Sequence, residues 1–201
     1  MAKKLNMGRI FYSRLLAAVA LLLLVFTRPA ITPEMAVYAL FINIGLVLIA
    51  IGVIGRVFST IFLGGHKNET VITYGPFSVC RNPLYLFSLV GVVGVCFLSA
   101  RLIFIFVIPY VMYRLYTALI KREEEFLKQK FSHTYEEYCA RTPRFWPKFS
   151  LYQMPEVITV YPVFVGRAAR DGLWWFAAYP AISFIYYLQH AGIITTQFLL
   201  P

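Results

Sequence analysis

The sequence predicts an all-α, polytopic transmembrane helix bundle, and three properties of its composition support this. Of the 201 residues, 60% are hydrophobic and only 14% are charged. The mean hydropathy is +0.69. Soluble domains carry about 25% charged residues, and disordered chains have low hydrophobicity. The composition therefore excludes both classes and places a single domain, residues 1–201, in a lipid bilayer.

Five apolar segments have the length of membrane-spanning helices, which require about 20 mostly apolar residues. The first resembles part of a signal peptide, but Thr27-Arg28-Pro29 is a poor cleavage context, so we expect a retained helix. Residues 99–101 leave room only for a tight turn, which predicts a helical hairpin. The predicted spans are residues 10–26, 35–55, 84–100, 102–120 and 172–188. Residues 157–166 are apolar but too short to span, so we expect an interfacial or re-entrant segment.

The basic residues predict the orientation, because cytoplasmic loops are enriched in Lys and Arg. With five alternating spans, 16 of the 19 basic residues fall on one side of the membrane. Arg28 and Arg101 fall on the other side, and Arg114 lies within a span. We therefore expect an integral, multi-pass membrane protein with a cytoplasmic N-terminus and active site, and with its C-terminus outside.

The net charge of +10 and the Cys and His residues argue against two other functions. The basic residues cluster beside apolar segments, which indicates contact with the lipid bilayer and no nucleic acid. Cys80, Cys96 and Cys139 form no C-x-x-C pair, and the three histidines have no ligand spacing. We therefore expect no metal site and no disulfide framework.

Two cytoplasmic helical elaborations, residues 56–83 and 121–171, carry the candidate chemistry. Asn82 and Pro83 are typical of a helix start, whose exposed N–H groups predict an anion site beside Arg81. Taken alone, Arg81 and Asn82 are better explained as a helix anchor and a helix cap. Residues 121–131 continue the fourth helix into the cytoplasm. Its three successive carboxylates, residues 123–125, either form a solvated face or include a ligand for a bound group. Glu123 shares the apolar helical stripe of Leu127 and Phe131, so we expect it to face inward and Glu125 to be solvated.

Four aromatic residues after this helix have two interpretations. They are either an interfacial aromatic belt or the lid of a pocket under the bilayer surface. They are Tyr135, Tyr138, Phe145 and Trp146.

Three motifs, taken in order, resemble the isoprenylcysteine carboxyl methyltransferase and phospholipid methyltransferase group. They are Gly75-Pro-Phe-x-x-x-Arg-Asn-Pro-x-Tyr85, Glu123-Glu-x-x-Leu-x-x-x-Phe-Ser-x-x-Tyr-x-x-Tyr138 and Pro143-Arg-Phe-x-Pro147. The resemblance covers residues 56–148, a methyltransferase-like core. Residues 149–201 would then be a C-terminal extension that contains the final span. Members of this group are integral membrane enzymes that use S-adenosylmethionine.

The resemblance implies an S-adenosylmethionine pocket formed by the cytoplasmic elaborations. Glu123 would contact the cofactor from the fourth helix. Arg81 and Glu124 are the catalytic candidates, with Glu124 the nearest base if the acceptor is an amine or a thiol. The other cofactor-binding residues implied by the motif positions are Thr70, Val71, Ile72, Phe77, Asn82, Pro83, Leu84 and Tyr85.

The chain departs from the family at three positions. Asn82 stands where the family usually has His, and Ser132 stands where it usually has Gly. Leu119 stands where the isoprenylcysteine members carry an Arg that binds the substrate carboxylate. We therefore expect a methyltransferase that acts on a lipidic or small amphipathic acceptor at the cytoplasmic membrane face.

Three alternatives stay open from the sequence. One is an isoprenylcysteine-type carboxyl methyltransferase. Another is a non-enzymatic membrane scaffold, which would not need the first two motifs together. The third is a membrane reductase, which would need a nicotinamide cofactor. The sequence contains no Gly-x-Gly-x-x-Gly, but such enzymes need not carry one.

Overall fold

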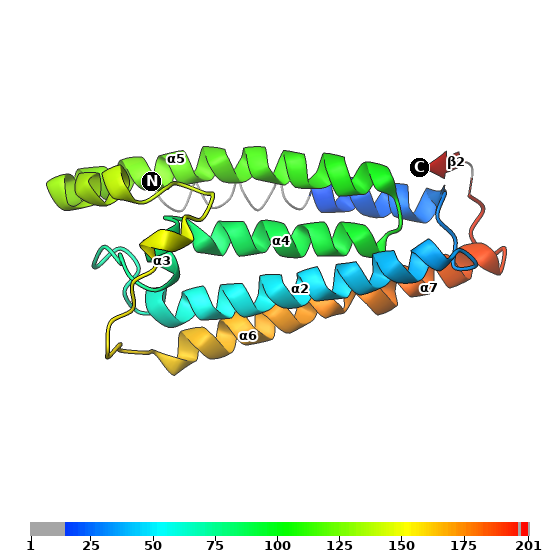
Figure 1. The fold of residues 1–201 in the computed structure, drawn as a ribbon. Coiled ribbons are helices and arrows are strands. Elements are labelled where there is room, and N and C mark those ends of the chain that lie inside the picture. The colour runs from blue at the N-terminus through cyan, green and yellow to red at the C-terminus, as the bar shows by residue number, and fades with distance from the viewer. Residues whose placement is uncertain (1–14, 197, 201) are drawn as a thin grey trace. The chain divides into compact units, whose positions relative to one another are not determined.

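The computed structural model describes residues 15–196 and 198–200 and is mostly helical (Figure 1). The expected helical class is therefore confirmed, with one addition, a pair of three-residue strands that pair in parallel. Residues 10–14 of the first predicted span lie outside the described residues. The elements are a first helix with the described part Leu15–Phe26, β1 (Thr27–Pro29), α2 (Ala36–Leu63), α3 (Pro76–Val79), α4 (Pro83–Leu98), α5 (Leu102–Arg141), the 3-10 turn η1 (Phe149–Leu151), α6 (Pro162–Phe176), α7 (Ala178–His190) and β2 (Phe198–Leu200).

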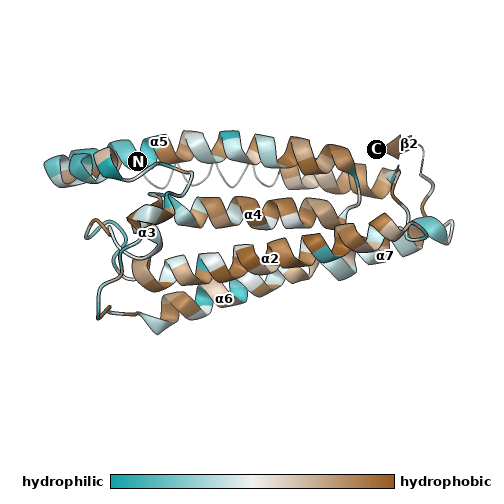
Figure 2. Ribbon diagram, in the orientation of Figure 1, coloured by the Kyte–Doolittle hydropathy of each residue, from teal (hydrophilic) through white to brown (hydrophobic). Residues whose placement is uncertain are grey.

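Within the part of the chain that the structure describes, two helices, α2 and α5, are long and apolar enough to cross a membrane. The first helix and α4 are apolar but shorter. Figure 2 shows hydrophobic residues along α2 and α4, and hydrophilic residues along the C-terminal part of α5. The predicted continuation of the fourth span beyond residue 120 is therefore confirmed, whereas the total of five spans and the orientation stay predictions.

Helix α2 continues eight residues beyond its predicted end at residue 55. Residues 56–63 contain no glycine or proline, and the hydroxyls of Ser59 and Thr60 donate to backbone carbonyls four residues earlier. The helix stops before Gly64 and Gly65, and Gly65 adopts a φ of 81° that favours glycine. Arg56 consequently lies inside a helix and not in the predicted loop.

The last predicted span, residues 172–188, falls on two helices, and its crossing of the membrane stays a prediction. Helix α6 begins ten residues earlier, at Pro162, a residue type suited to the first helical position. A one-residue interruption at Ala177, whose φ of −64° and ψ of −16° stay helical, separates α6 from α7. Pro180 explains this break, because it has no N–H to donate to the carbonyl of Phe176 and its ring disfavours a continuous helix there. Residues 162–166, expected to be interfacial or re-entrant, form the start of α6.

The chain divides into two compact units. The first unit contains the described residues of 1–49, 92–115 and 176–201. Its apolar core is formed by Leu24, Cys96 and Phe104. A Cβ atom at Gly45 would lie 2.8 Å from the carbonyl oxygen of Gly94, so α2 and α4 approach closely in this unit.

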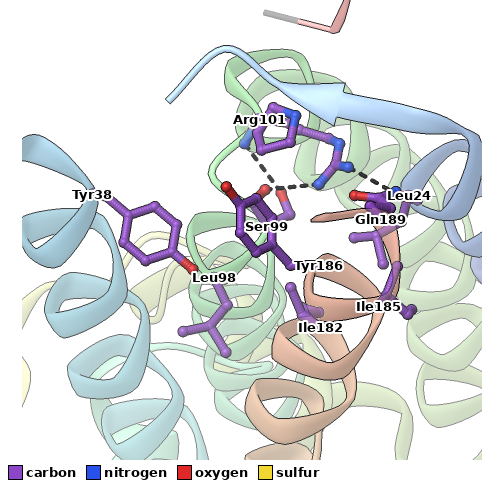
Figure 3. Close-up of a pocket in the computed structure, with 10 residues that line it drawn as sticks. Leu24, Tyr38, Leu98, Ser99, Arg101, Ile182, Ile185, Tyr186 and Gln189 are labelled. Atoms are coloured by element: carbon purple, nitrogen blue, oxygen red, sulfur yellow. Dashed lines mark hydrogen bonds between the residues drawn. The ribbon is translucent and has the colours of Figure 1, made fainter. Parts of the chain in front are cut away.

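A buried polar cluster in the first unit closes the C-terminal end of the first helix (Figure 3). Arg101 is 3% exposed, and its guanidinium donates to the carbonyl of Leu24 at 3.0 Å and to that of Ser99 at 2.9 Å. The Nε2 atom of Gln189 donates to the carbonyls of Leu24 at 2.9 Å and Val25 at 2.7 Å. These donors satisfy carbonyls that a helix C-terminus leaves without partners. The adjoining cavity has about 10 Å³, the lower limit for one water.

The second unit contains residues 50–91 and 116–175, and it therefore holds all three motifs. Its helices pack through glycines, since a Cβ atom at Gly52 would lie 2.8 Å from the backbone of Gly91. Arg56 donates to the hydroxyl of Ser88, and its guanidinium lies 5.8 Å from the Trp175 ring centroid. A separate apolar core is formed by Phe62, Ile72 and Phe77.

Candidate active site

The three motifs, far apart in the sequence, come together in the second unit. The hydroxyl of Tyr138 in the second motif donates to the carbonyl of Phe77 in the first, at 2.7 Å. The backbone N–H of Arg81 donates to the carbonyl of Pro143 in the third motif, at 2.9 Å. The three motifs that carry the resemblance are therefore held together by direct hydrogen bonds.

Helix α4 begins where the sequence predicted it, directly after Asn82. The carbonyl of Asn82 accepts from the N–H groups of Tyr85 at 3.1 Å and Leu86 at 3.2 Å. Its side-chain Nδ2 donates to the carbonyl of Arg144 at 3.0 Å. A carbonyl only accepts hydrogen bonds, so this contact fixes the orientation of the amide and leaves Oδ1 as its acceptor.

Glu124 is the centre of a buried ion cluster. Its side chain is 5% exposed, and Oε2 accepts from Arg144 Nη2 at 2.8 Å and from Arg144 Nε at 2.9 Å. Arg81 Nη2 lies 3.4 Å from the other oxygen, Oε1. The hydrogen bond to Glu124 raises the pKa of Arg144. The sequence singled out Arg81 and Glu124 but missed Arg144, because its contact with Glu124 spans 20 residues.

Arg81 has one donor that its surroundings leave unused. The Arg81 side chain is only 10% exposed. Its Nε atom is buried and has no hydrogen-bond partner among the described residues. A buried donor without a partner is costly, so this nitrogen is a candidate contact for a bound group.

The neighbouring carboxylates differ from Glu124 in their surroundings. Glu123 faces Lys67, with Oε1 and Nζ 3.8 Å apart, and both side chains are substantially exposed. Glu125 is exposed, as expected. The buried carboxylate is thus Glu124, whereas the helical spacing had favoured Glu123 as the inward-facing residue.

The remaining residues implied by the resemblance fall into two groups. Ile72 and Phe77 are buried in the apolar core, and Pro83 is fully buried. The Tyr85 ring centroid lies 5.1 Å from that of Tyr116 on α5. The side chains that are at least partly exposed are those of Thr70, Val71, Asn82, Leu84, Tyr85 and Glu123.

The four aromatic residues that were candidates for an interfacial belt do not share one environment. Tyr135, Tyr138 and Phe145 are buried, whereas Trp146 is 67% exposed. Both tyrosines pack inside the unit, and this burial raises the pKa of their hydroxyls, which stay protonated. An interfacial role therefore fits only Trp146 among these four.

The chain matches the phospholipid methyltransferase family over residues 31–134. It belongs to the phospholipid methyltransferase family. This membership confirms the resemblance and makes the protein a member of a membrane-type methyltransferase family. The family match contains the first motif and most of the second, and it ends before the third motif and Arg144.

The relatives of this phospholipid methyltransferase family member carry two kinds of name. The chain is 30% identical over 155 residues to the cobalt-zinc-cadmium resistance protein CzcN of Cupriavidus metallidurans. This alignment covers 77% of the chain and 71% of the relative. It is 26% identical to the nickel-cobalt-cadmium resistance protein NccN of Alcaligenes xylosoxydans xylosoxydans, over 81% and 76% of the two chains. It is 29% identical to protein-S-isoprenylcysteine O-methyltransferase B of Arabidopsis thaliana, over 50% and 56%. No solved structure matches the chain.

Proposed function

We propose that this protein is an integral membrane methyltransferase that uses S-adenosylmethionine and acts on a lipidic or small amphipathic acceptor at the cytoplasmic membrane face. The observation that carries this proposal is the convergence of the three motifs around Glu124 in one unit. Family membership supports methyl transfer as the reaction class.

The side chains present fit the polar groups of this cofactor. Its carboxylate matches the N-terminus of α4 and the buried Nε of Arg81, which has no hydrogen-bond partner in the described part of the chain. Its ammonium and ribose hydroxyls match two acceptors, Asn82 Oδ1 and the Glu123 carboxylate. We propose that Thr70, Val71, Leu84 and Tyr85 line the same site, and that Ile72, Phe77 and Pro83 support it from the interior.

We propose that Arg81 and Glu124 position the site and take no proton during the reaction. Both oxygens of Glu124 face guanidinium groups, so ion pairs already engage the carboxylate. The bound cofactor supplies an activated methyl group on a sulfonium. The protein's part is then to orient the acceptor and to exclude water. An acceptor that is a carboxylate or a phosphate needs no base for this step.

Leu119 bears on the identity of the acceptor. It lies one helical turn before Glu123, at the position where the isoprenylcysteine members carry Arg, and an aliphatic side chain cannot form a fork with a carboxylate. We therefore propose an acceptor other than a prenylcysteine carboxylate. The isoprenylcysteine-type reaction is the alternative, supported by the plant relatives. A methyl-transfer assay with a farnesylated cysteine analogue beside a total lipid extract separates them, and efficient turnover of the analogue alone would favour the alternative.

The two metal-resistance relatives suggest a physiological setting. We propose that methylation of a membrane component by this protein contributes to tolerance of divalent metals. Expression in a metal-sensitive host should raise the tolerated cobalt or cadmium concentration, and Glu123→Gln should remove that gain. An equal gain with the variant would separate metal tolerance from cofactor use.

The cofactor assignment is tested by ligand-dependent stability. S-adenosylhomocysteine should raise the thermal midpoint of the detergent-solubilised protein, and a 100-fold excess over Kd should add about 2.7 kcal/mol. Glu123→Gln should weaken this binding by about 1.5–3 kcal/mol, the cost of a hydrogen bond to a charged group, whereas the exposed control Glu125→Gln should not. A shift with NADPH alone would indicate a reductase, and no shift with either ligand would favour a scaffold.

A further inference from the structure

Residues 146–163, which we call the outer loop, expose apolar side chains that methyl transfer does not use. Trp146 is 67% exposed, Phe149 77% and Val157 86%. Tyr152 and Met154 are also at least half exposed. Large exposed apolar side chains concentrated in one segment make that segment a candidate interaction site.

Hydrogen bonds and an apolar contact attach the outer loop to the second unit. The N–H of Lys148 donates to the carbonyl of Val79 at 2.9 Å. The N–H of Gly75 donates to the carbonyl of Gln153 at 2.7 Å. Ile158 packs against the apolar core of the unit. The backbone of the loop is therefore fixed to the unit, while the side chains of Trp146 and Phe149 stay exposed.

The outer loop lies at the C-terminal end of α2. Tyr161 contacts Gly65, and its ring centroid lies 5.3 Å from that of His66. Helix α2 has 28 residues and is therefore about 42 Å long, more than the about 30 Å of a bilayer's hydrocarbon core. The polar residues 66–70 follow this end of α2, which makes the end, and the loop beside it, a candidate for contact with the lipid head groups.

The composition of the outer loop matches a membrane–water interface. Trp and Tyr are enriched there because one end of each side chain is apolar and the other is polar. Exposed basic residues stand within or beside the loop, and their charge complements lipid phosphates. They are Lys148, Arg167 and Arg170.

We propose that the outer loop is a membrane anchor whose residues Trp146, Phe149 and Val157 insert at the boundary between the head groups and the acyl chains of the bilayer. The hydrogen bonds of this loop to Gly75 and Val79 then hold the first motif at the membrane surface. The proposal does not depend on methyl transfer, and its test requires no cofactor.

Spin-label accessibility in lipid vesicles measures the depth of these positions. Phe149→Cys and Val157→Cys are made in a Cys139→Ser background, in which the remaining cysteines are buried. The labelled protein is reconstituted in vesicles of phosphatidylcholine and phosphatidylglycerol. The ratio of collision with oxygen to collision with a polar nickel chelate is compared with an exposed control on α5, Gln129→Cys, and an apolar reference, Phe106→Cys, whose native side chain is 72% exposed.

The oxygen-to-nickel ratio at positions 149 and 157 should be several-fold higher than at position 129 and lower than at position 106. Two independent positions guard against misfolding of either variant. Ratios at 149 and 157 equal to the ratio at 129 would place the loop in water, and ratios equal to that at 106 would place it in the hydrocarbon core. Either result overturns the proposal.

Discussion

Replacing Glu124 with Gln should destabilise the protein strongly, because the substitution leaves Arg81 buried without its carboxylate. The Arg81 side chain is 10% exposed and Glu124 5%. Removing one partner of a buried ion pair costs about 3–5 kcal/mol, mostly from the uncompensated charge that stays behind. Arg144 is 45% exposed and can regain water, so the expected loss lies near the lower limit, about 3 kcal/mol.

Glu125→Gln is the matched control, since it makes the same chemical change one residue away on an exposed side chain. Surface substitutions of this kind change stability by about 0.5 kcal/mol or less. Chemical denaturation of the detergent-solubilised protein, followed by far-UV circular dichroism, compares the two free energies of unfolding. Arg144→Gln should lose less than Glu124→Gln, because Arg81 keeps its partner. Equal losses for the two glutamate variants would refute the buried-cluster account.

Three further predictions follow from single residues. Ser132→Gly should raise the thermal midpoint, because Ser132 has φ 42° and ψ −120°, a strained conformation that costs about 1–3 kcal/mol; a lower midpoint would contradict this. Burial raises the pKa of the Cys80 thiol to about 11, above the 9.0 of an exposed thiol, so the native state keeps a proton that the unfolded state loses. Stability should therefore fall between about pH 9 and 11, and Cys80→Ala should flatten that part of the profile of midpoint against pH. Gly91→Ala should cost about 1–3 kcal/mol by overpacking, since its Cβ would lie 1.8 Å from the Trp175 ring, whereas Gly166→Ala has no atom to displace within 4 Å and should cause no loss of stability.

The parts of the fold that sequence predicted correctly depend on local signals. Asn82 and Pro83 start α4, and residues 99–101 form the predicted turn, because caps and short connections are set by neighbouring residues. The interruption within residues 172–188 also has a local cause. Apolar length predicts a span there, whereas Pro180 has no N–H for the carbonyl of Phe176 and divides the segment between α6 and α7.

The sequence predicts the motifs of the site but not the contacts between their side chains. The order of the motifs resembles a family, and their hydrogen bonds show that they lie together in the fold. Helical spacing favoured Glu123 as the inward carboxylate, but a stripe of Leu127 and Phe131 does not reveal which neighbour meets an arginine. Arg144 decides that question from 20 residues away, and a single sequence carries no signal for a contact at that separation.

Transfer of a labelled methyl group tests the proposed function most directly. Vesicles that contain the protein and a total lipid extract are incubated with methyl-labelled S-adenosylmethionine, and the organic phase is counted and separated. Label should appear in a lipidic or small amphipathic product, fall sharply with Glu123→Gln and persist with Glu125→Gln. No labelled product from folded protein, or equal label with and without the carboxylate of Glu123, would contradict the proposed methyltransferase site.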